Sequence, residues 1–220
     1  INHRAGKNLI GAFYQPPLVI IDPHLLRTLP ARELTSGWSE IIKHAVIQSS
    51  TPGGERADLW AFLERNASRL LEREDPALNY LIYRNVALKA AVVEQDEREV
   101  RLRAFLNFGH TIGHAIEAAD YQLLHGEAVA VGMRAAMRLG ERMGTCDATA
   151  VSRLDSLLDQ FGLPATATAA PDRVAALLTS DKKRSDGKQR WVLPQQQGGV
   201  ALRDDVPDGV VREVLATLLT

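Results

Sequence analysis

Three histidines gather in a short central stretch of the chain. His110, His114 and His125 fall within 16 residues, although the sequence of 220 residues has only six histidines. Glycines stand beside two of them, at Gly113 and Gly126, and leave room for a ligand or another backbone to come close. Because imidazole nitrogens are common zinc ligands, this clustering predicts a metal site. Taken singly, each histidine would more commonly be an ordinary core or surface residue.

The spacing alone leaves the set of metal ligands open. If residues 104–118 are helical, His110 and His114 project from one face and could share one zinc ion. His125 would lie about 22 Å further along an unbroken helix, so it can join them only if the chain reverses near residues 120–124. Two histidines, one carboxylate and an open position would suit a catalytic zinc. The candidate sets are both near histidines, or one of them with His125, and the third ligand would be Glu40, Glu117 or Glu127.

A helix is predicted upstream, from about Pro30 to Ile47, because apolar residues recur there at three- and four-residue spacing. Glu40 and Lys43 are three residues apart and therefore neighbours on its surface. Two interpretations are open: a solvated ion pair of little consequence, or a carboxylate held at the edge of a cleft with a lysine beside it.

The pattern of apolar residues predicts helix for most of the remaining chain as well, with a few short strands. Lys89 falls in an apolar run of a predicted helix, where a lysine needs an exit to water or a partner anion. Further helices are expected at 56–73, 75–94, from 126 onward, and at 147–161, 172–180 and 206–220. A buried strand is expected at 18–22, a basic turn at 181–188, and a hairpin from 190–193 and 200–203.

The composition narrows the class of protein. A formal net charge of −1 gives no reason to expect nucleic acid or an anionic membrane as a partner. The single cysteine, Cys146, forms no internal disulfide and suits a reducing, cytoplasmic compartment. No apolar run reaches the length of a membrane span. The first residues lack a signal-peptide pattern. Because the sequence begins at Ile1 and not at Met, we expect a fragment of a longer protein.

Several short motifs, in order along the chain, closely resemble the 3-dehydroquinate synthase family. Each motif is weak alone, but together they are highly specific and extend from residue 2 to about residue 194. They are KNLIGAF at 7–13, EIIK at 40–43, NFGHTIGHAIE at 107–117, HGE at 125–127, DKK at 181–183 and VLP at 192–194. The resemblance implies a mainly α chain, the C-terminal helical domain of a two-domain α/β fold. Residues 1–30 would be the tail of the NAD-binding α/β domain, and residues 31–220 the helical domain that binds metal and substrate.

The resemblance also implies roles for particular residues. It makes Glu40, His110 and His125 the metal ligands, and His114 a residue that faces the substrate. The residues expected to line the substrate pocket are Lys43, Lys89, Glu99, Arg103, Asn107 and His114. Asn8 and Lys183, or its neighbour Lys182, are expected near the substrate phosphate. Contacts to NAD are expected from Lys7, Leu25, Leu26, Arg27 and Thr28.

The activity that the resemblance implies is a carbon–oxygen lyase reaction of the shikimate pathway, in aromatic amino acid biosynthesis. It converts 3-deoxy-D-arabino-heptulosonate 7-phosphate to 3-dehydroquinate and phosphate, with NAD and zinc, or cobalt on the same ligands. A homodimer is expected. The chain alone is expected to be inactive, because the family has a further catalytic lysine, an aspartate and the glycine-rich NAD loop upstream. The alternatives are another sugar-phosphate cyclase such as a valiolone-type enzyme, a metal-dependent alcohol dehydrogenase of related fold, or a truncated non-catalytic metal-binding domain.

Overall fold

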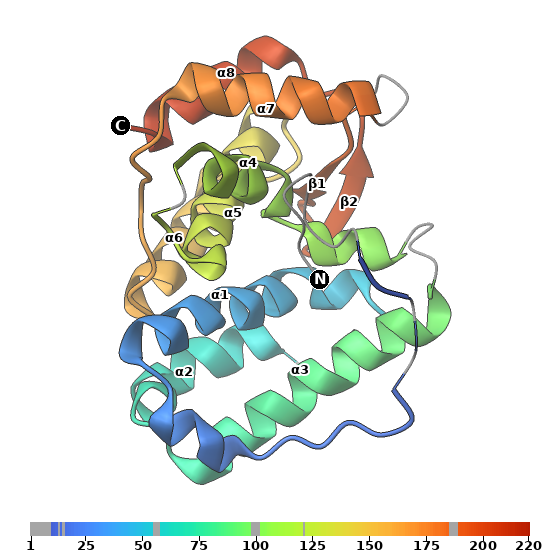
Figure 1. Cartoon of the computed structure of the whole chain (residues 1–220), viewed down its shortest axis with the longest axis vertical. Coiled ribbons are helices and arrows are strands. Elements are labelled where there is room, and N and C mark those ends of the chain that lie inside the picture. The colour runs from blue at the N-terminus through green and yellow to red at the C-terminus, as the bar shows by residue number, and fades with distance from the viewer. Residues whose placement is uncertain are drawn as a thin grey trace.

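The protein is mainly helical, as expected (Figure 1). The computed structural model describes residues 10–12, 14, 16–54, 58–97, 102–120, 122–184 and 189–220, without the side chains of 120 and 180–184. The α-helices are α1 (Ala31–Ile47), α2 (Leu59–Leu71), α3 (Asp75–Gln95), α4 (His110–Asp120), α5 (His125–Arg142), α6 (Ala148–Gln160), α7 (Pro171–Arg184) and α8 (Asp208–Leu218). Short 3-10 helices are η1 (Pro23–Thr28), η2 (Gln48–Ser50) and η4 (Leu102–Asn107), and the strands are β1 (Trp191–Pro194) and β2 (Val200–Arg203).

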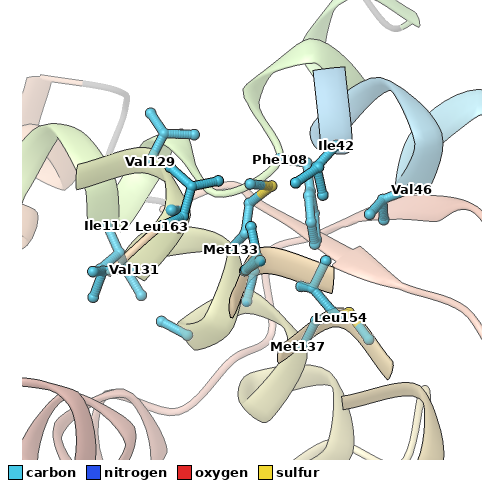
Figure 2. Packing of buried hydrophobic residues seen from close by; sticks show 14 of the residues in the cluster. Ile42, Val46, Phe108, Ile112, Val129, Val131, Met133, Met137, Leu154 and Leu163 are labelled. Atoms are coloured by element: carbon cyan, nitrogen blue, oxygen red, sulfur yellow. The ribbon is translucent and has the colours of Figure 1, made fainter. Parts of the chain in front are cut away.

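Helix α5 is the central element of the fold. It contacts α1, α4, α6, α8 and β1, and nearly all its residues are buried. In Figure 1, α1, α2 and α3 form the lower group, while α4, α5, α7, α8 and the two strands lie above them. The core runs between these groups, where Ile42 of α1 and Met133 of α5 lie close to Phe108 (Figure 2).

Glycines allow α4 and α5 to pack unusually close together. A Cβ atom built on Gly132 of α5 would lie 2.0 Å from the carbonyl oxygen of Gly109, just before α4. Gly109 itself has φ +78°, a left-handed conformation that favours glycine. The chain therefore turns sharply out of η4, and α4 begins at His110 directly against α5.

The two strands form an antiparallel hairpin in which Trp191 pairs with Arg203 and Pro194 with Val200, as predicted. Ser50, at the end of η2, ties the hairpin to the end of α1: its hydroxyl donates to the carbonyl of Val200 and accepts from the backbone N–H of the same residue. Among the helices that the structure describes, none has the length and apolar character to cross a bilayer.

Two predicted elements are wrong. Residues 18–22 are not a buried strand but exposed, irregular chain, with Leu18 72% and Ile20 82% exposed. A strand needs a neighbour for its backbone groups, and the two strands in the described residues pair only with each other. The basic turn predicted at 181–188 is also wrong in part, because α7 continues to Arg184; residues 185–188 lie outside the described chain.

Candidate metal centre

His110 is the first residue of α4. Its Nδ1 lies 3.1 Å from the carbonyl oxygen of Phe108, to which an Nδ1–H group can donate. That hydrogen bond leaves Nε2 free as an acceptor, which is the form in which histidine binds a metal ion. Nε2 lies 3.2 Å from Oε1 of Glu40.

His125 is the first residue of α5. The chain reverses between α4 and α5, which a site shared with His110 requires. Its Nδ1 lies 3.3 Å from Oε2 of Glu117, and its Nε2 lies 3.6 Å from Oε1 of Glu40. A carboxylate on one ring nitrogen orients the other toward a metal ion. Both histidines therefore direct Nε2 toward the same carboxylate oxygen.

Glu40 reaches the two histidines from α1. Its Oε2 accepts a hydrogen bond from Nζ of Lys43, the neighbour predicted from the sequence. Its Oε1 is buried and has no hydrogen-bond partner among the described residues, although two imidazole nitrogens lie close to it. A buried carboxylate oxygen without a donor is costly, and a cation between it and the nitrogens would compensate it.

The distances from Glu40 Oε1 to the two histidine nitrogens suit zinc. In a tetrahedral site with ligand bonds of about 2.0–2.2 Å, neighbouring ligand atoms lie about 3.3–3.6 Å apart. The distances from Glu40 Oε1 to the two Nε2 atoms are 3.2 and 3.6 Å. The donor set of two imidazoles and one carboxylate therefore fits a zinc ion in both chemistry and spacing.

His114 lies beside the same cluster. Its ring centroid is 5.3 Å from that of His110 and 5.6 Å from that of His125, and one potential ligand atom from each of the three histidines lies within 4.8 Å of the others. The side chain is exposed. A ligand set that includes His114 is therefore also compatible with the positions.

Burial and neighbouring charges set the protonation of the acidic and basic groups. Burial alone raises the pKa of Glu40, but His110, His125 and Lys43 outweigh it and hold the pKa well below its ordinary value. Burial lowers the pKa of Lys43, opposed by the Glu40 carboxylate and assisted by the charge of Lys89. Glu40 is therefore a carboxylate anion at neutral pH.

The structure brings other predicted pocket residues onto elements that contact one another. Lys89 lines a cavity of about 890 Å³ between α3 and the segment at Pro16–Ile21. Arg103 lies on η4, which contacts α1 and α3; its Nη1 donates to the carbonyl of Glu97 at 2.8 Å. Asn107 ends the same 3-10 helix and is half-buried.

The expected cofactor and phosphate contacts are less complete. Leu25–Thr28 belongs to η1, where the carbonyl of Leu26 accepts a hydrogen bond from Arg73, two residues after the end of α2. Lys7, Asn8 and Glu99 lie outside the described residues, and the side chains of Lys182 and Lys183, on α7, are not described.

The sequence reasoning missed a tight ion pair beside the site. Nε and Nη2 of Arg32, in the first turn of α1, donate to the two oxygens of Glu127 at 2.8 and 2.7 Å. Glu127 was a candidate third ligand, but its carboxylate is engaged with Arg32 instead. Sequence patterns give no signal for this pair, because its members are 95 residues apart.

Comparison with solved structures indicates the class of protein to which this fold belongs. The chain is similar to 2-epi-5-epi-valiolone synthase from Streptomyces hygroscopicus subsp. jinggangensis 5008, solved with NAD⁺ and Zn²⁺ bound, with a TM-score of 0.86, 29% identity, and coverage of 99% of this chain and 60% of that one. It is also similar to 2-deoxy-scyllo-inosose synthase complexed with carbaglucose-6-phosphate, NAD⁺ and Co²⁺, with a TM-score of 0.77, 26% identity, and coverage of 100% and 61%. The fold is that of the dehydroquinate synthase-like cyclases.

Sequence comparison then narrows the class to one family. The family model for the 3-dehydroquinate synthase C-terminal region matches residues 37–184, and that for the N-terminal region matches 1–36. Curated relatives include 3-dehydroquinate synthases from Pseudoalteromonas translucida, 43% identical over 98% of this chain and 60% of the relative, and from Acetivibrio thermocellus, 39% identical over 99% and 59%. The chain belongs to the 3-dehydroquinate synthase family and spans about 60% of the length of these relatives.

Proposed function

We propose that this chain supplies the metal- and substrate-binding part of a 3-dehydroquinate synthase, a cytoplasmic homodimer that converts 3-deoxy-D-arabino-heptulosonate 7-phosphate to 3-dehydroquinate and phosphate. The observation that carries the proposal is the convergence of Glu40 Oε1 with Nε2 of His110 and His125, with Lys43 on the second carboxylate oxygen. Membership of the 3-dehydroquinate synthase family supports this reaction for the cluster.

The proposed division places residues 1–30 in the tail of an NAD-binding domain and residues 31–220 in the helical domain. The boundary between the two family models, at 36/37, falls inside α1. A division before Ala31 keeps α1 whole, and with it the helix that carries both Glu40 and Lys43. This boundary also keeps Arg32 with the helical domain.

Zinc is the proposed metal, held by Glu40, His110 and His125, and cobalt would take the same ligands. When bound, the ion would polarise and acidify a substrate hydroxyl. Similar cyclases were solved with Zn²⁺ or Co²⁺. The protein's own contribution is to hold the three donors at matching distances and to keep Glu40 anionic.

NAD⁺ is the proposed cofactor, since both cyclases were solved with it. When bound, it would accept and return a hydride. In this chain Lys7 and Leu25–Thr28 would contact it. The exposed position of Leu25 leaves it open to such a contact.

The substrate is a phosphorylated sugar acid, and the chain offers cationic groups for both of its anions. Arg103 suits the carboxylate, which a guanidinium can bind through two hydrogen bonds. Lys89 suits either anion as a compact charge, and Lys43 lies where it can orient a group at the metal centre. The further contacts we propose come from Asn8, Glu99, Asn107, His114 and Lys183. Such a constellation lowers the barrier mainly by positioning.

The experiment that tests the proposal measures metal content and phosphate release together. The 220-residue chain and a form extended upstream in its gene would be assayed with the heptulosonate phosphate and NAD⁺. About one zinc per chain, with phosphate release only from the longer form, is the expected result. A zinc-free protein in both forms would refute the site, and zinc without phosphate release in the longer form would refute the reaction.

A second candidate, another sugar-phosphate cyclase, is favoured by the TM-score of 0.86 to the valiolone synthase. Phosphate release from sugar phosphates that lack a carboxylate, of which glucose 6-phosphate resembles the ligand of the inosose synthase, separates the two. The dehydroquinate synthase proposal expects release only from the carboxylated heptulosonate substrate. The higher identity to the curated dehydroquinate synthases supports that outcome.

A further inference from the structure

A single carboxylate beside the metal centre joins three parts of the chain. Glu127, in the first turn of α5, accepts two parallel hydrogen bonds from Arg32 at 2.8 and 2.7 Å. Its Oε2 also accepts the backbone N–H of Leu124 at 2.8 Å. Nη2 of Arg32 donates in addition to the carbonyl of Gln122 at 2.8 Å. The start of α1, the segment before α5 and the start of α5 are thereby linked through one ion pair.

The same two helices meet again one turn further along α1. The backbone N–H of Gly126 donates to Oγ of Ser36 at 3.1 Å. A Cβ atom at Gly126 would lie 1.9 Å from the carbonyl oxygen of Ser36, so the helices touch through backbone there. The start of α5 is consequently held against α1 at two points, Arg32 and Ser36.

Both contacts lie close in sequence to the proposed ligands Glu40 and His125. On α1, Arg32 and Ser36 lie two turns and one turn before Glu40, and on α5 Gly126 and Glu127 directly follow His125. The separation of Glu40 Oε1 from His125 Nε2, 3.6 Å, is therefore set by how α1 meets the start of α5. Metal sites tolerate only about 0.2 Å of deviation in ligand distances.

We infer that Arg32 is a positioning residue: through its ion pair with Glu127 it sets the distance between Glu40 and His125, and so the affinity of the centre for its metal. The inference rests on the metal site proposed above. The pair is suited to this role because Glu127 is nearly buried, with 11% of its side chain exposed, and the two-point contact of guanidinium with carboxylate fixes an orientation as well as a distance.

The test is Arg32→Met in the 220-residue chain. The dissociation constant for Zn²⁺ would be measured by competition with a chromophoric chelator, and the visible absorption of the Co²⁺-loaded protein would be recorded. We expect Zn²⁺ affinity about 10-fold weaker and a shifted Co²⁺ spectrum, because the ligand geometry changes. Arg32→Lys, which keeps the charge but loses the parallel pair of hydrogen bonds, should retain only part of the affinity.

Arg153→Met is the matched control. Arg153 on α6 also donates two parallel hydrogen bonds, at 2.7 and 2.7 Å, to Glu64 on α2, and its side chain is 49% exposed against 58% for Arg32. It should leave both Zn²⁺ affinity and the Co²⁺ spectrum unchanged. Any loss of stability common to the two variants is thereby separated from an effect on the metal centre.

The outcomes distinguish this inference from the site on which it rests. If the unaltered chain and Arg32→Met bind Zn²⁺ equally tightly with the same Co²⁺ spectrum, Arg32 is not a positioning residue, even if the melting temperature falls. If the unaltered chain binds no Zn²⁺, the metal site itself is refuted and the inference falls with it. Should Arg32→Met fail to fold, Arg32→Lys decides by the same two measurements.

Discussion

In the proposed metal centre, His125 and His114 occupy different environments. Nε2 of His125 faces the unpartnered oxygen of Glu40, and its other ring nitrogen is held by Glu117. His114 is exposed at the edge of the cluster. A direct comparison of the two side chains therefore tests the choice of ligands.

His125→Ala should abolish stoichiometric zinc binding, because two donors rarely retain the ion against a chelator. His114→Ala should keep the zinc and reduce turnover of the upstream-extended form, measured by phosphate release. Elemental analysis after dialysis gives the metal content of both variants. The reverse pattern, with zinc lost only in His114→Ala, would show that the four-residue spacing on α4 supplies the ligands.

His44, a buried histidine that is not among the proposed metal ligands, should make stability depend on pH. His44 is buried on α1, and its Nδ1 lies 2.8 Å from Oδ1 of Asn85 on α3. Burial, with the charge of Lys43, lowers the pKa of His44 to about 4. The unfolded chain has the ordinary pKa of about 6.5 and therefore binds a proton more readily than the folded chain.

The contribution of neutral His44 to the free energy of unfolding is fully present above about pH 6.5. It is lost as the pH falls from about 6.5 toward 4, and the loss reaches about 3 kcal/mol. Urea unfolding of the metal-free chain between pH 7 and pH 4 measures this loss. His44→Gln keeps a polar side chain but does not titrate, so its free energy of unfolding should fall less steeply over the same interval. Equal slopes in the two proteins would contradict the assignment.

At the scale of elements, the close approach of α4 to α5 brings His110 and His125 within reach of each other. Gly132 permits that approach, since a Cβ atom there would lie 2.0 Å from the carbonyl of Gly109 and 2.7 Å from the backbone nitrogen of Gly113. Backbone atoms cannot move aside as a flexible side chain can. The two helices would have to separate to admit even a methyl group.

Gly132→Ala should therefore destabilise the fold by about 3 kcal/mol and weaken zinc binding with it. Gly37→Ala on α1 is the control, because a Cβ atom there meets nothing within 4 Å; it should stabilise the helix by about 0.5–1 kcal/mol. Chemical denaturation of both variants measures the two effects. A neutral Gly132→Ala would show that the α4–α5 contact is not as close as described.

At the scale of the whole molecule, the proposed ligands come from three helices, α1, α4 and α5, which belong to both helix groups of Figure 1. An ion bound to the folded state alone stabilises it by mass action. A bound ion should therefore stabilise the packing of the two helix groups against each other.

Zn²⁺ at 100 times its dissociation constant should add about 2.7 kcal/mol of stability, which corresponds to a rise in melting temperature of about 5–10 °C for a chain of this size. Thermal unfolding with and without a chelator measures the shift. His125→Ala serves as the control and should show almost none. An equal rise in the variant would mean that zinc binds somewhere else.

Local patterns in the sequence determined the helices, because the spacing of apolar residues and the positions of proline and glycine act within a few residues. The neighbours Glu40 and Lys43 follow from the same helical geometry, and the family motifs supplied the residues proposed for the centre. The strand expected at 18–22 was wrong because a strand depends on a partner elsewhere in the chain.

Tertiary structure alone decided the places of the three candidate carboxylates. Glu40 faces two imidazoles, Glu117 holds the far nitrogen of His125, and Glu127 pairs with Arg32. These assignments depend on the reversal between α4 and α5 and on how α1 crosses them. Contacts between residues up to 95 positions apart arise only when packed helices bring them together, so no local spacing could have foreseen them.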